Sequence, residues 1–398
     1  MLLSRLKNGL NQADKHSVSA AAELEHDAGQ ESGSTDLALA PSPQPLRVAV
    51  FTTSYPRHAD DFAGRFVSDA VHCLRERGVQ VDVVAPGVYR LYGLDFDGGG
   101  MVRAVKRRPW LAPLLALSMI RTLRRAARNA DLVHVHWLAG AVVARLATRK
   151  PFVVTIHGTI SGGILDDFKL TQRFPRLVRF LLKRARGVIC VSTALGESVA
   201  ACGVPNVVIP NGIAIPAEAG LETEPLEVFY TGRLSPEKGI AELVAATQGM
   251  NLVVSGDGPL RSLVPGALGF ISREELHRRF ARAAVVVCPS ISEGFGVVCA
   301  EAMAHGKPVV ASAVGGLCGL VDDERTGLLV PPGDVEALRA AIQRLLDDPE
   351  LRIRLGAAAR RKITGMCGWD SVTQRTLEAY ALGQTDSAPQ ALPAVTLG

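Results

Sequence analysis

The chain has 398 residues, of which 47% are hydrophobic and 21% are charged, and its formal net charge is +5 at pH 7. This length is more than one ordinary hydrophobic core holds, and the apolar fraction excludes general disorder, so we expect two domains. The small net charge does not indicate binding to nucleic acid.

Residues 1–45 mix Ser, Gly, Ala and acidic residues without an apolar period and end in a run of alternating prolines. This composition is typical of a flexible tail. Arg5, Lys7 and Asn8 interrupt the apolar core that a signal peptide requires. No later segment reaches the ~18 apolar residues of a membrane span. Because the seven cysteines also occur singly, we expect a cytoplasmic protein.

From residue 46 onward, short β-branched runs alternate with longer stretches of helical period. The runs cover residues 48–53, 79–85, 132–135, 152–156 and 188–191. Such alternation predicts a parallel sheet covered by helices. We expect this Rossmann-like domain to span residues 46–215.

A stretch rich in Pro, Ala, Glu and Gly at 216–226 interrupts the alternation and predicts a hinge. A second Rossmann-like domain is predicted over 227–382, with its last helix crossing back to the first domain and a flexible tail over 383–398. Open parallel sheets bind ligands outside the carboxyl ends of their strands, so the loops there are the candidates for a site. The apolar runs of the second domain are 227–230, 252–255, 285–288, 308–312 and 328–330.

The first of these runs leads into a glycine-bearing turn that carries two cations, Arg233 and Lys238. Arginine presents a planar fork to phosphate oxygens, and lysine is a compact charge that can neutralise a leaving pyrophosphate. The pair therefore suits a diphosphate. A solvated turn with a proline at the head of a helix explains this segment equally well.

A glycine-rich loop follows the run at 285–288 and leads into a helix. The first amides of a helix have no internal partner and form a site for anions and hydroxyls. We expect Glu293, in the loop, to accept hydrogen bonds from sugar hydroxyls. Glu301, about two turns into the helix among small and apolar residues, needs a partner. The alternative interpretation makes Glu293 a helix-start acid and Glu301 a salt-bridged helix residue.

In their order and spacing, these motifs resemble glycosyltransferase family 4, the group 1 glycosyltransferases, which are retaining enzymes with the GT-B fold. The resemblance extends from about residue 47 to 382. It implies two Rossmann-like parallel-sheet domains that face each other across a cleft, the first (46–215) binding the acceptor and the second (227–382) binding the sugar nucleotide. Further segments that follow the family order are Thr53-Ser54-Tyr55-Pro56, Gly64-Arg65-Phe66-Val67, Val133 to Trp137, Thr155-Ile156-His157-Gly158, Ile209-Pro210-Asn211-Gly212-Ile213 and Gly256-Asp257-Gly258-Pro259.

The resemblance also implies roles for individual residues. Arg233 and Lys238 would hold the donor diphosphate, Glu301 its ribose and Glu293 its sugar. His157 would approach the sugar from the other domain, although the residues alone favour a structural histidine there. The catalytic residues implied are thus Arg233, Lys238, Glu293 and His157. The donor-binding residues implied are Gly64, Gly232, Gly294, Phe295, Gly296, Val297 and Glu301.

Two further patterns carry weaker signals. His134 and His136 are predicted as strand residues, one of them facing the cleft, with a proton relay as the alternative. Asp95 and Asp97 form a DxD pair of the kind that holds a divalent ion in glycosyltransferases of the other common fold, but a polar loop explains them adequately. We therefore predict that no metal is required, and that the nucleoside diphosphate sugar is the co-substrate.

Basic residues are concentrated in two stretches. Residues 101–130 contain eight Arg or Lys and no acid, with apolar residues interleaved, and residues 173–186 contain six more basic residues. Such a surface suits anionic headgroups and a lipid-linked acceptor, which favours peripheral contact with the inner face of the plasma membrane. A solvated helix face, or a patch that attracts acidic acceptor sugars, is the alternative.

Together these features predict transfer of a hexosyl unit from a UDP- or GDP-sugar to an acceptor hydroxyl, with retention. The acceptor is expected to be a lipid-linked glycan or a polysaccharide precursor of the cell envelope. A GT-B sugar-nucleotide epimerase and a catalytically silent sugar-nucleotide-binding subunit are the alternatives. A nicotinamide dehydrogenase is disfavoured because no G-x-G-x-x-G follows the run at 48–53.

Overall fold

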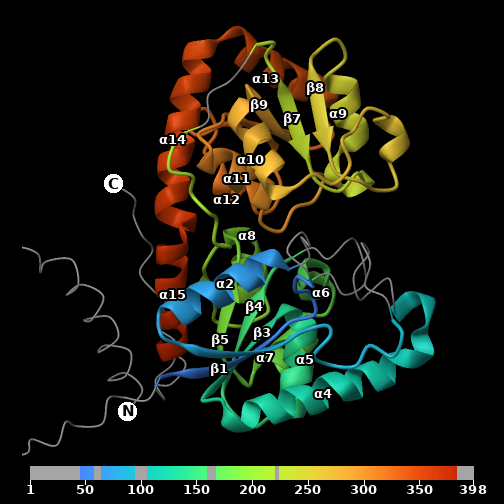
Figure 1. Ribbon diagram of the computed structural model, residues 1–398, viewed down its shortest axis with the longest axis vertical. Helices are drawn as coiled ribbons and strands as arrows, with labels where there is room; N and C mark the ends of the chain where they lie inside the picture. Colours follow the sequence, from blue (N-terminus) through green and yellow to red (C-terminus); the bar gives the residue numbers. More distant parts are fainter. Residues whose placement is uncertain (1–44, 58–63, 95–104, 159–166, 220–223, 383–398) are drawn as a thin grey trace, which may run out of the picture.

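The computed structural model describes residues 45–57, 64–94, 105–158, 167–219 and 224–382. It consists of two α/β units, one above the other in Figure 1, with a long helical segment along one side of both. The predicted tails lie outside the described residues except for Pro45, and so does the middle of the predicted hinge.

The first unit is built on a six-stranded sheet with strand order β2-β1-β3-β4-β5-β6, and every strand pair is parallel. All residues of β3 and β4 are buried, which is why these strands are continuous apolar runs and not alternating ones. The run predicted for each of the first five strands overlaps the strand observed. The strands are β1 (Arg47–Phe51), β2 (Gln80–Val84), β3 (Leu132–His136), β4 (Phe152–Ile156), β5 (Ala185–Cys190) and β6 (Val207–Val208).

Helices cover both faces of this sheet. Because successive side chains of a strand point to opposite faces, Val48 and Val50 pack in one core with α2 and α15, whereas Ala49 and Phe51 pack in another with α4 and α5. The helices of the first unit are α2 (Arg65–Glu76), α4 (Ala112–Asn129), α5 (Trp137–Ala147), α6 (Asp167–Arg173), α7 (Pro175–Leu182) and α8 (Thr193–Ala201).

The second unit is built on a five-stranded parallel sheet with order β11-β10-β9-β7-β8. Its strands are β7 (Val228–Thr231), β8 (Leu252–Ser255), β9 (Val285–Cys288), β10 (Val309–Ser312) and β11 (Leu328–Val330). Across the described ranges, no helix has the length and hydrophobicity needed to cross a bilayer. The helices of this unit are α9 (Ile240–Ala246), α10 (Arg273–Arg282), α11 (Val297–Ala304), α12 (Leu317–Leu320), α13 (Val335–Asp347) and α14 (Pro349–Cys367).

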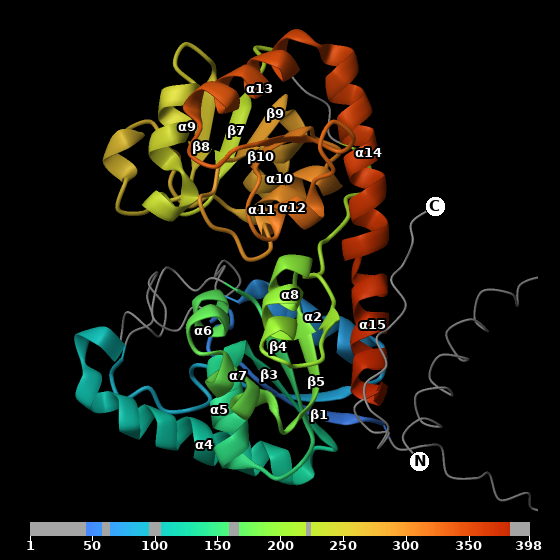
Figure 2. The same cartoon turned by 180° about the vertical axis from the view of Figure 1, so that it is seen from behind.

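The last helix, α15 (Trp369–Leu382), belongs in space to the first unit. Helix α14 packs against α11 and α13, and after Gly368 the chain continues as α15, which packs against α2 and β5. The two views of the molecule show this path from both sides (Figures 1 and 2). Tyr380 of α15 is fully buried in the first unit, so α15 completes that core.

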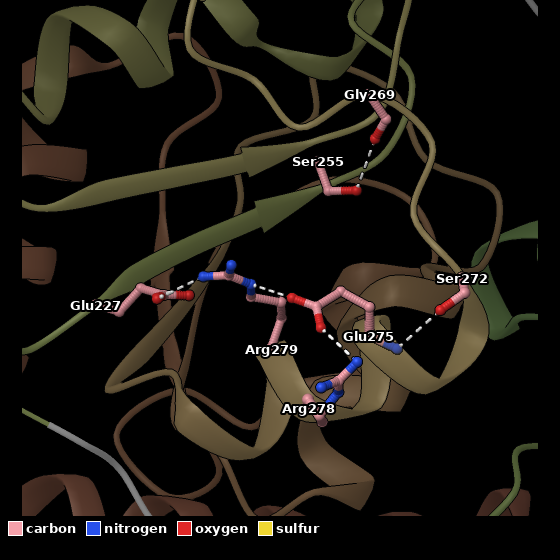
Figure 3. A network of polar contacts seen from close by, with 7 residues as sticks. All are labelled: Glu227, Ser255, Gly269, Ser272, Glu275, Arg278 and Arg279. Carbon is pink, nitrogen blue, oxygen red and sulfur yellow. Dashed lines mark hydrogen bonds and ion pairs between the residues drawn. The ribbon is translucent and has the colours of Figure 1, made fainter.

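A network of ion pairs fixes α10 to the start of β7 (Figure 3). Ser272 caps the helix by accepting the backbone N–H of Glu275 at 3.2 Å. Arg279 donates to Glu275 at 2.8 Å and to Glu227 at 3.2 Å. Burial raises the pKa of Glu227, and Arg279 opposes that shift. Arg279 thus connects α10 to the residue that precedes β7.

Candidate active site

The turn after β7 and the loop after β9 are locked together. Gly239 has φ 67°, and a Cβ there would lie 1.9 Å from the carbonyl oxygen of Pro289, so only glycine fits. The backbone N–H of Ile291 donates to the carbonyl oxygen of Glu237 at 3.0 Å. The two loops that carry the predicted donor-site residues therefore form one rigid edge of the second sheet.

Lys238 and Glu293 meet at this edge. The Lys238 Nζ lies 2.6 Å from the Glu293 Oε2, and both side chains are only partly exposed. They line a small pocket of about 40 Å³ together with Gly232, Gly296 and Ser290. Residues 55 positions apart thus form a cation–carboxylate pair beside glycines, an arrangement that can bind phosphate oxygens and sugar hydroxyls.

The loop at 293–296 is shaped by its contacts with the segment after β10. Gly296 has φ 100°, and a Cβ there would lie 2.6 Å from Leu317 Cδ2. The N–H of Gly316 donates to the carbonyl oxygen of Glu293 at 3.0 Å. Phe295 is buried, and α11 begins at Val297 with no side-chain cap on its first amides.

Glu301 lies one turn into α11, not two as predicted, because the helix begins only after Gly296. Burial raises the pKa of its carboxyl to about 7, and Arg273 opposes the shift. Arg273 is the first residue of α10 and also lies 4.0 Å from Asp69 of α2. Arg273 thus acts on Glu301 electrostatically and also reaches toward the first unit.

Arg233 is exposed on the turn after β7. The Tyr230 hydroxyl donates to its carbonyl oxygen at 3.0 Å, which fixes the backbone of the turn. Lys238 is the last residue of the short helix η2 (Pro236–Lys238), which begins three residues after Arg233. The two predicted cations therefore lie on one turn.

The carboxyl ends of the two sheets approach each other closely. Gly158, just after β4, has φ 84°, and a Cβ there would lie 2.8 Å from the Cα of Gly294. His157 therefore lies beside the loop that carries Glu293. Gly64 is also required sterically, because a Cβ there would lie 2.1 Å from the Ser54 carbonyl oxygen. Its predicted contact with the donor stays a prediction.

His157 is part of a buried cluster at this meeting point. Its Nε2 lies 2.8 Å from Nδ1 of His136, and its ring packs against Phe66 and Trp137 at centroid distances of 4.8 and 5.0 Å. His134 and His136 are both buried. Burial lowers the pKa of His157 to about 3, so the ring is neutral at pH 7.

Two residues of this cluster were given no role by the sequence analysis of the site: Asp167 and Trp137. Asp167 is buried, and its carboxylate accepts the backbone N–H groups of Leu138 at 3.1 Å and His157 at 3.4 Å. It thereby ties the amino end of α5 to the end of β4. Trp137 has φ 63° and is buried, a strained conformation of the kind that concentrates at functional sites. No local pattern marks either residue, since each acts through partners far along the chain.

Several predicted features lie apart from this site or outside the description. Asp95 and Asp97 fall outside the described residues. The predicted basic stretch 101–130 includes α4, with residues 101–104 outside the described residues, and the stretch 173–186 runs from the end of α6 through α7 into β5. Helices α4 and α7 lie on the side of the first unit away from α2 and α15. The site itself consists of one cluster from each unit, around Lys238 and Glu293 in the second and around His157 in the first.

Family models and related sequences both identify this chain as similar to glycosyltransferases. Residues 63–215 match the family model described as Glycosyltransferase Family 4, and residues 266–362 match that of Glycosyl transferases group 1. An uncharacterized glycosyltransferase of Methanocaldococcus jannaschii is 28% identical, with 85% of this chain and 98% of that protein covered. The alpha-maltose-1-phosphate synthase of Mycolicibacterium smegmatis is 30% identical, with coverage of 84% and 99%.

Solved structures share the architecture. Sucrose-phosphate synthase from Thermosynechococcus elongatus superposes with a TM-score of 0.68 at 24% identity, covering 84% of this chain and 98% of that one. HepE from Anabaena, in complex with UDP, gives 0.63 at 21% identity, with coverage of 84% and 100%. The two facing parallel-sheet units are therefore those of the GT-B fold. The chain belongs to glycosyltransferase family 4, the group 1 glycosyltransferases, and is an enzyme that transfers a sugar from a nucleotide sugar.

Proposed function

We propose that the protein is a retaining hexosyltransferase that uses a UDP- or GDP-sugar and glycosylates a hydroxyl of a lipid-linked glycan or polysaccharide precursor of the cell envelope. The observation that carries the proposal is the contact between Gly158 and Gly294. It brings the neutral imidazole of His157 to the loop that holds the Lys238–Glu293 pair. UDP-glucose is the first donor to test, because the solved HepE complexes contain UDP or UDP-glucose.

In this proposal the two cations bind the donor diphosphate. Arg233 and Lys238 neutralise the charge that grows on the leaving nucleotide as the glycosidic bond breaks. This placement of fixed positive charge supports a reaction that needs no metal ion. The uncapped amides at the start of α11, from Val297 onward, add further donors for oxygen atoms of the substrate.

Retention follows from a front-face route. The bond between the anomeric carbon and the phosphate oxygen breaks, the acceptor oxygen bonds to that carbon from the same face, and the acceptor proton passes to the leaving phosphate oxygen. Glu293 is ion-paired with Lys238, which suits hydrogen bonding to sugar hydroxyls better than attack on carbon. Catalysis then rests on positioning and charge stabilisation in a closed site.

We also propose that the first unit docks on an anionic membrane. The docking surface, here called the basic apolar face, consists of the exposed side chains of α4, α5 and α7, which pack in that order. On α4, Leu114, Leu117, Arg121 and Arg125 are exposed at helical spacing. The remaining exposed apolar members are Trp110 just before α4, Val142 and Leu146 on α5, and Phe174, Leu177 and Phe180 at α7.

This surface combines the two features that peripheral binding requires. The Arg145 guanidinium lies 4.2 Å from the Phe180 ring centroid, so charge and apolar area are adjacent. A bilayer that carries anionic headgroups would bind the cations and take up the apolar side chains. A lipid-linked acceptor would then reach the enzyme by diffusion in the membrane plane.

A donor panel tests the proposed function. UDP-, GDP- and ADP-linked glucose, galactose, N-acetylglucosamine and mannose are first compared by thermal shift and then by donor turnover with and without acceptor extracts. We expect stabilisation by one nucleotide class and turnover that increases with acceptor. Conversion of the donor sugar without any acceptor would identify an epimerase, and binding without turnover would identify a silent subunit.

A further inference from the structure

The ends of β3 and β4 bring three imidazoles into one buried row. The ring centroids of His134 and His136 are 4.6 Å apart, and those of His136 and His157 are 5.1 Å apart. His134 and His136 share one face of β3 because they are two residues apart. The sheet register places His136 opposite Thr155, two residues before His157, so the row runs from the core toward the cleft.

Hydrogen bonds occupy both nitrogens of His134 and join His136 to His157. Both ring nitrogens of His134 are occupied, one by the Tyr380 hydroxyl and one by Thr155 Oγ1, each at 2.7 Å. Nδ1 of His136 and Nε2 of His157 are 2.8 Å apart. Nδ1 of His157 is buried and has no hydrogen-bond partner among the described residues.

The His157 ring is held so that its two nitrogens do not exchange places. Phe66, Trp137 and His136 surround it, with ring centroids 4.8 to 5.1 Å away. Asp167 holds its backbone N–H. Nε2 therefore always faces His136, and Nδ1 always faces away from it.

The direction of the hydrogen bond between His136 and His157 depends on which of the two facing nitrogens carries the proton. Burial lowers the pKa of His157 to about 3 and that of His136 well below its usual value, so each ring is neutral and carries one N–H at pH 7. The bond between them needs one N–H and one lone pair. Asn211 lines the same cavity of about 50 Å³. Its side chain forms no hydrogen bond with Nδ1 of His157, but its interaction with the ring raises the pKa of His157 against the effect of burial, which favours a proton on the nitrogen that faces away from His136.

We propose that His136 is a positioning residue: its Nδ1–H donates to Nε2 of His157, keeps the His157 proton on Nδ1, and so presents an N–H to an oxygen of the donor sugar. The inference rests on the proposed function of His157. His136 touches no substrate. It acts by excluding the other tautomer, in which His157 Nδ1 would offer a lone pair in place of a donor.

Nitrogen NMR of the full chain labelled with ¹⁵N-histidine tests the tautomer directly. The His157 resonances are assigned by their loss in His157→Gln. We expect a protonated Nδ1 and an unprotonated Nε2 in the wild type and in His136→Asn, whose amide retains an N–H donor near the position of Nδ1. His136→Asp places an acceptor there, and the His157 proton should move to Nε2. Tyr380→Phe, which alters only the His134 end, should leave the His157 signals unchanged.

Steady-state kinetics test the consequence. His136→Leu should lower kcat roughly 10-fold with little change in the KM for the donor, His136→Asn should recover most of that loss, and His136→Asp should not. A protonated Nε2 in the wild type, or an unchanged tautomer and kcat in both His136→Leu and His136→Asp, would overturn the proposal. If His157→Ala itself keeps the wild-type kcat, the proposed function of His157 fails, even where NMR supports the tautomer.

Discussion

Gly158 and Gly294 touch across the boundary between the two sheets, with a Cβ on Gly158 coming within 2.8 Å of the Gly294 Cα. Each of these glycines follows a strand, and each lies beside a residue of the candidate site. The close approach means that the site is completed only when the two units meet. We therefore expect catalysis to depend on the absence of a side chain at Gly158, which allows this contact.

Gly158→Ala should impair turnover more than folding. The added methyl group would hold the two units apart, so we expect kcat to fall at least about 10-fold, because small displacements of reacting groups are costly. Gly78→Ala is the matched control, since Gly78 has a similar φ of 79° but nothing within 4 Å of its Cβ position. Thermal denaturation of both variants measures the loss of stability that Ala causes at a positive φ, which the two variants share. Equal kcat losses in both variants would contradict the role of the contact.

Lys238→Ala should lower turnover by on the order of 100-fold, because it removes charge stabilisation of the leaving nucleotide. The fold should persist, since Lys238 is partly exposed and its ion pair with Glu293 contributes little to stability. Lys362→Ala provides the comparison, because Lys362 forms an ion pair of 2.8 Å with Asp322 elsewhere in the same unit. Donor turnover near the wild-type rate in Lys238→Ala would refute the assignment of Lys238.

Sequence patterns predicted the strands and the proximity of Lys238 to Glu293, for a physical reason. Strands buried on both faces need continuous β-branched runs, which are visible locally, whereas β6 has only two residues. Lys238 and Glu293 were placed at one edge because the carboxyl ends of parallel strands meet there.

The cluster around His157 in the first unit depends on contacts between residues that are far apart in the sequence. The contact between His136 and His157 follows from the register of β3 against β4, which no motif encodes. The left-handed φ of Trp137 is imposed by its surroundings, since tryptophan has no intrinsic preference for it. Asp167 acquires its role only when α6 packs beside the amino end of α5.

The titration of Glu301 should appear in nucleotide binding. Burial raises its pKa to about 7, so the ionised fraction rises from about a tenth at pH 6 to about nine-tenths at pH 8. If the carboxylate accepts from a ribose hydroxyl, affinity for UDP should rise up to about 10-fold over this range. Glu301→Gln should remove the pH dependence, whereas Glu324→Gln, at an exposed ion pair with Arg344, should not. Calorimetric titration at both pH values measures this.

The same raised pKa predicts the sign of a stability effect. A carboxyl whose pKa is higher in the folded state than in the unfolded state contributes stability below the unfolded value, near 4.5, and loses that contribution as the pH rises through about 7. The melting temperature of Glu301→Gln relative to wild type should therefore be higher at pH 8 than at pH 5. An identical difference at both pH values would show that Glu301 has an ordinary pKa.

Binding to anionic vesicles should depend on both components of the basic apolar face. We expect co-sedimentation with vesicles that contain phosphatidylglycerol at low salt, and release at high salt as the charges are screened. The double substitution Leu146→Ser and Phe180→Ser should weaken binding, because it removes exposed apolar area on α5 and α7. Ile353→Ser is the control, since Ile353 is 70% exposed but lies on α14 of the second unit. Absence of binding at low salt, or equal weakening by the control, would exclude this face as a membrane contact.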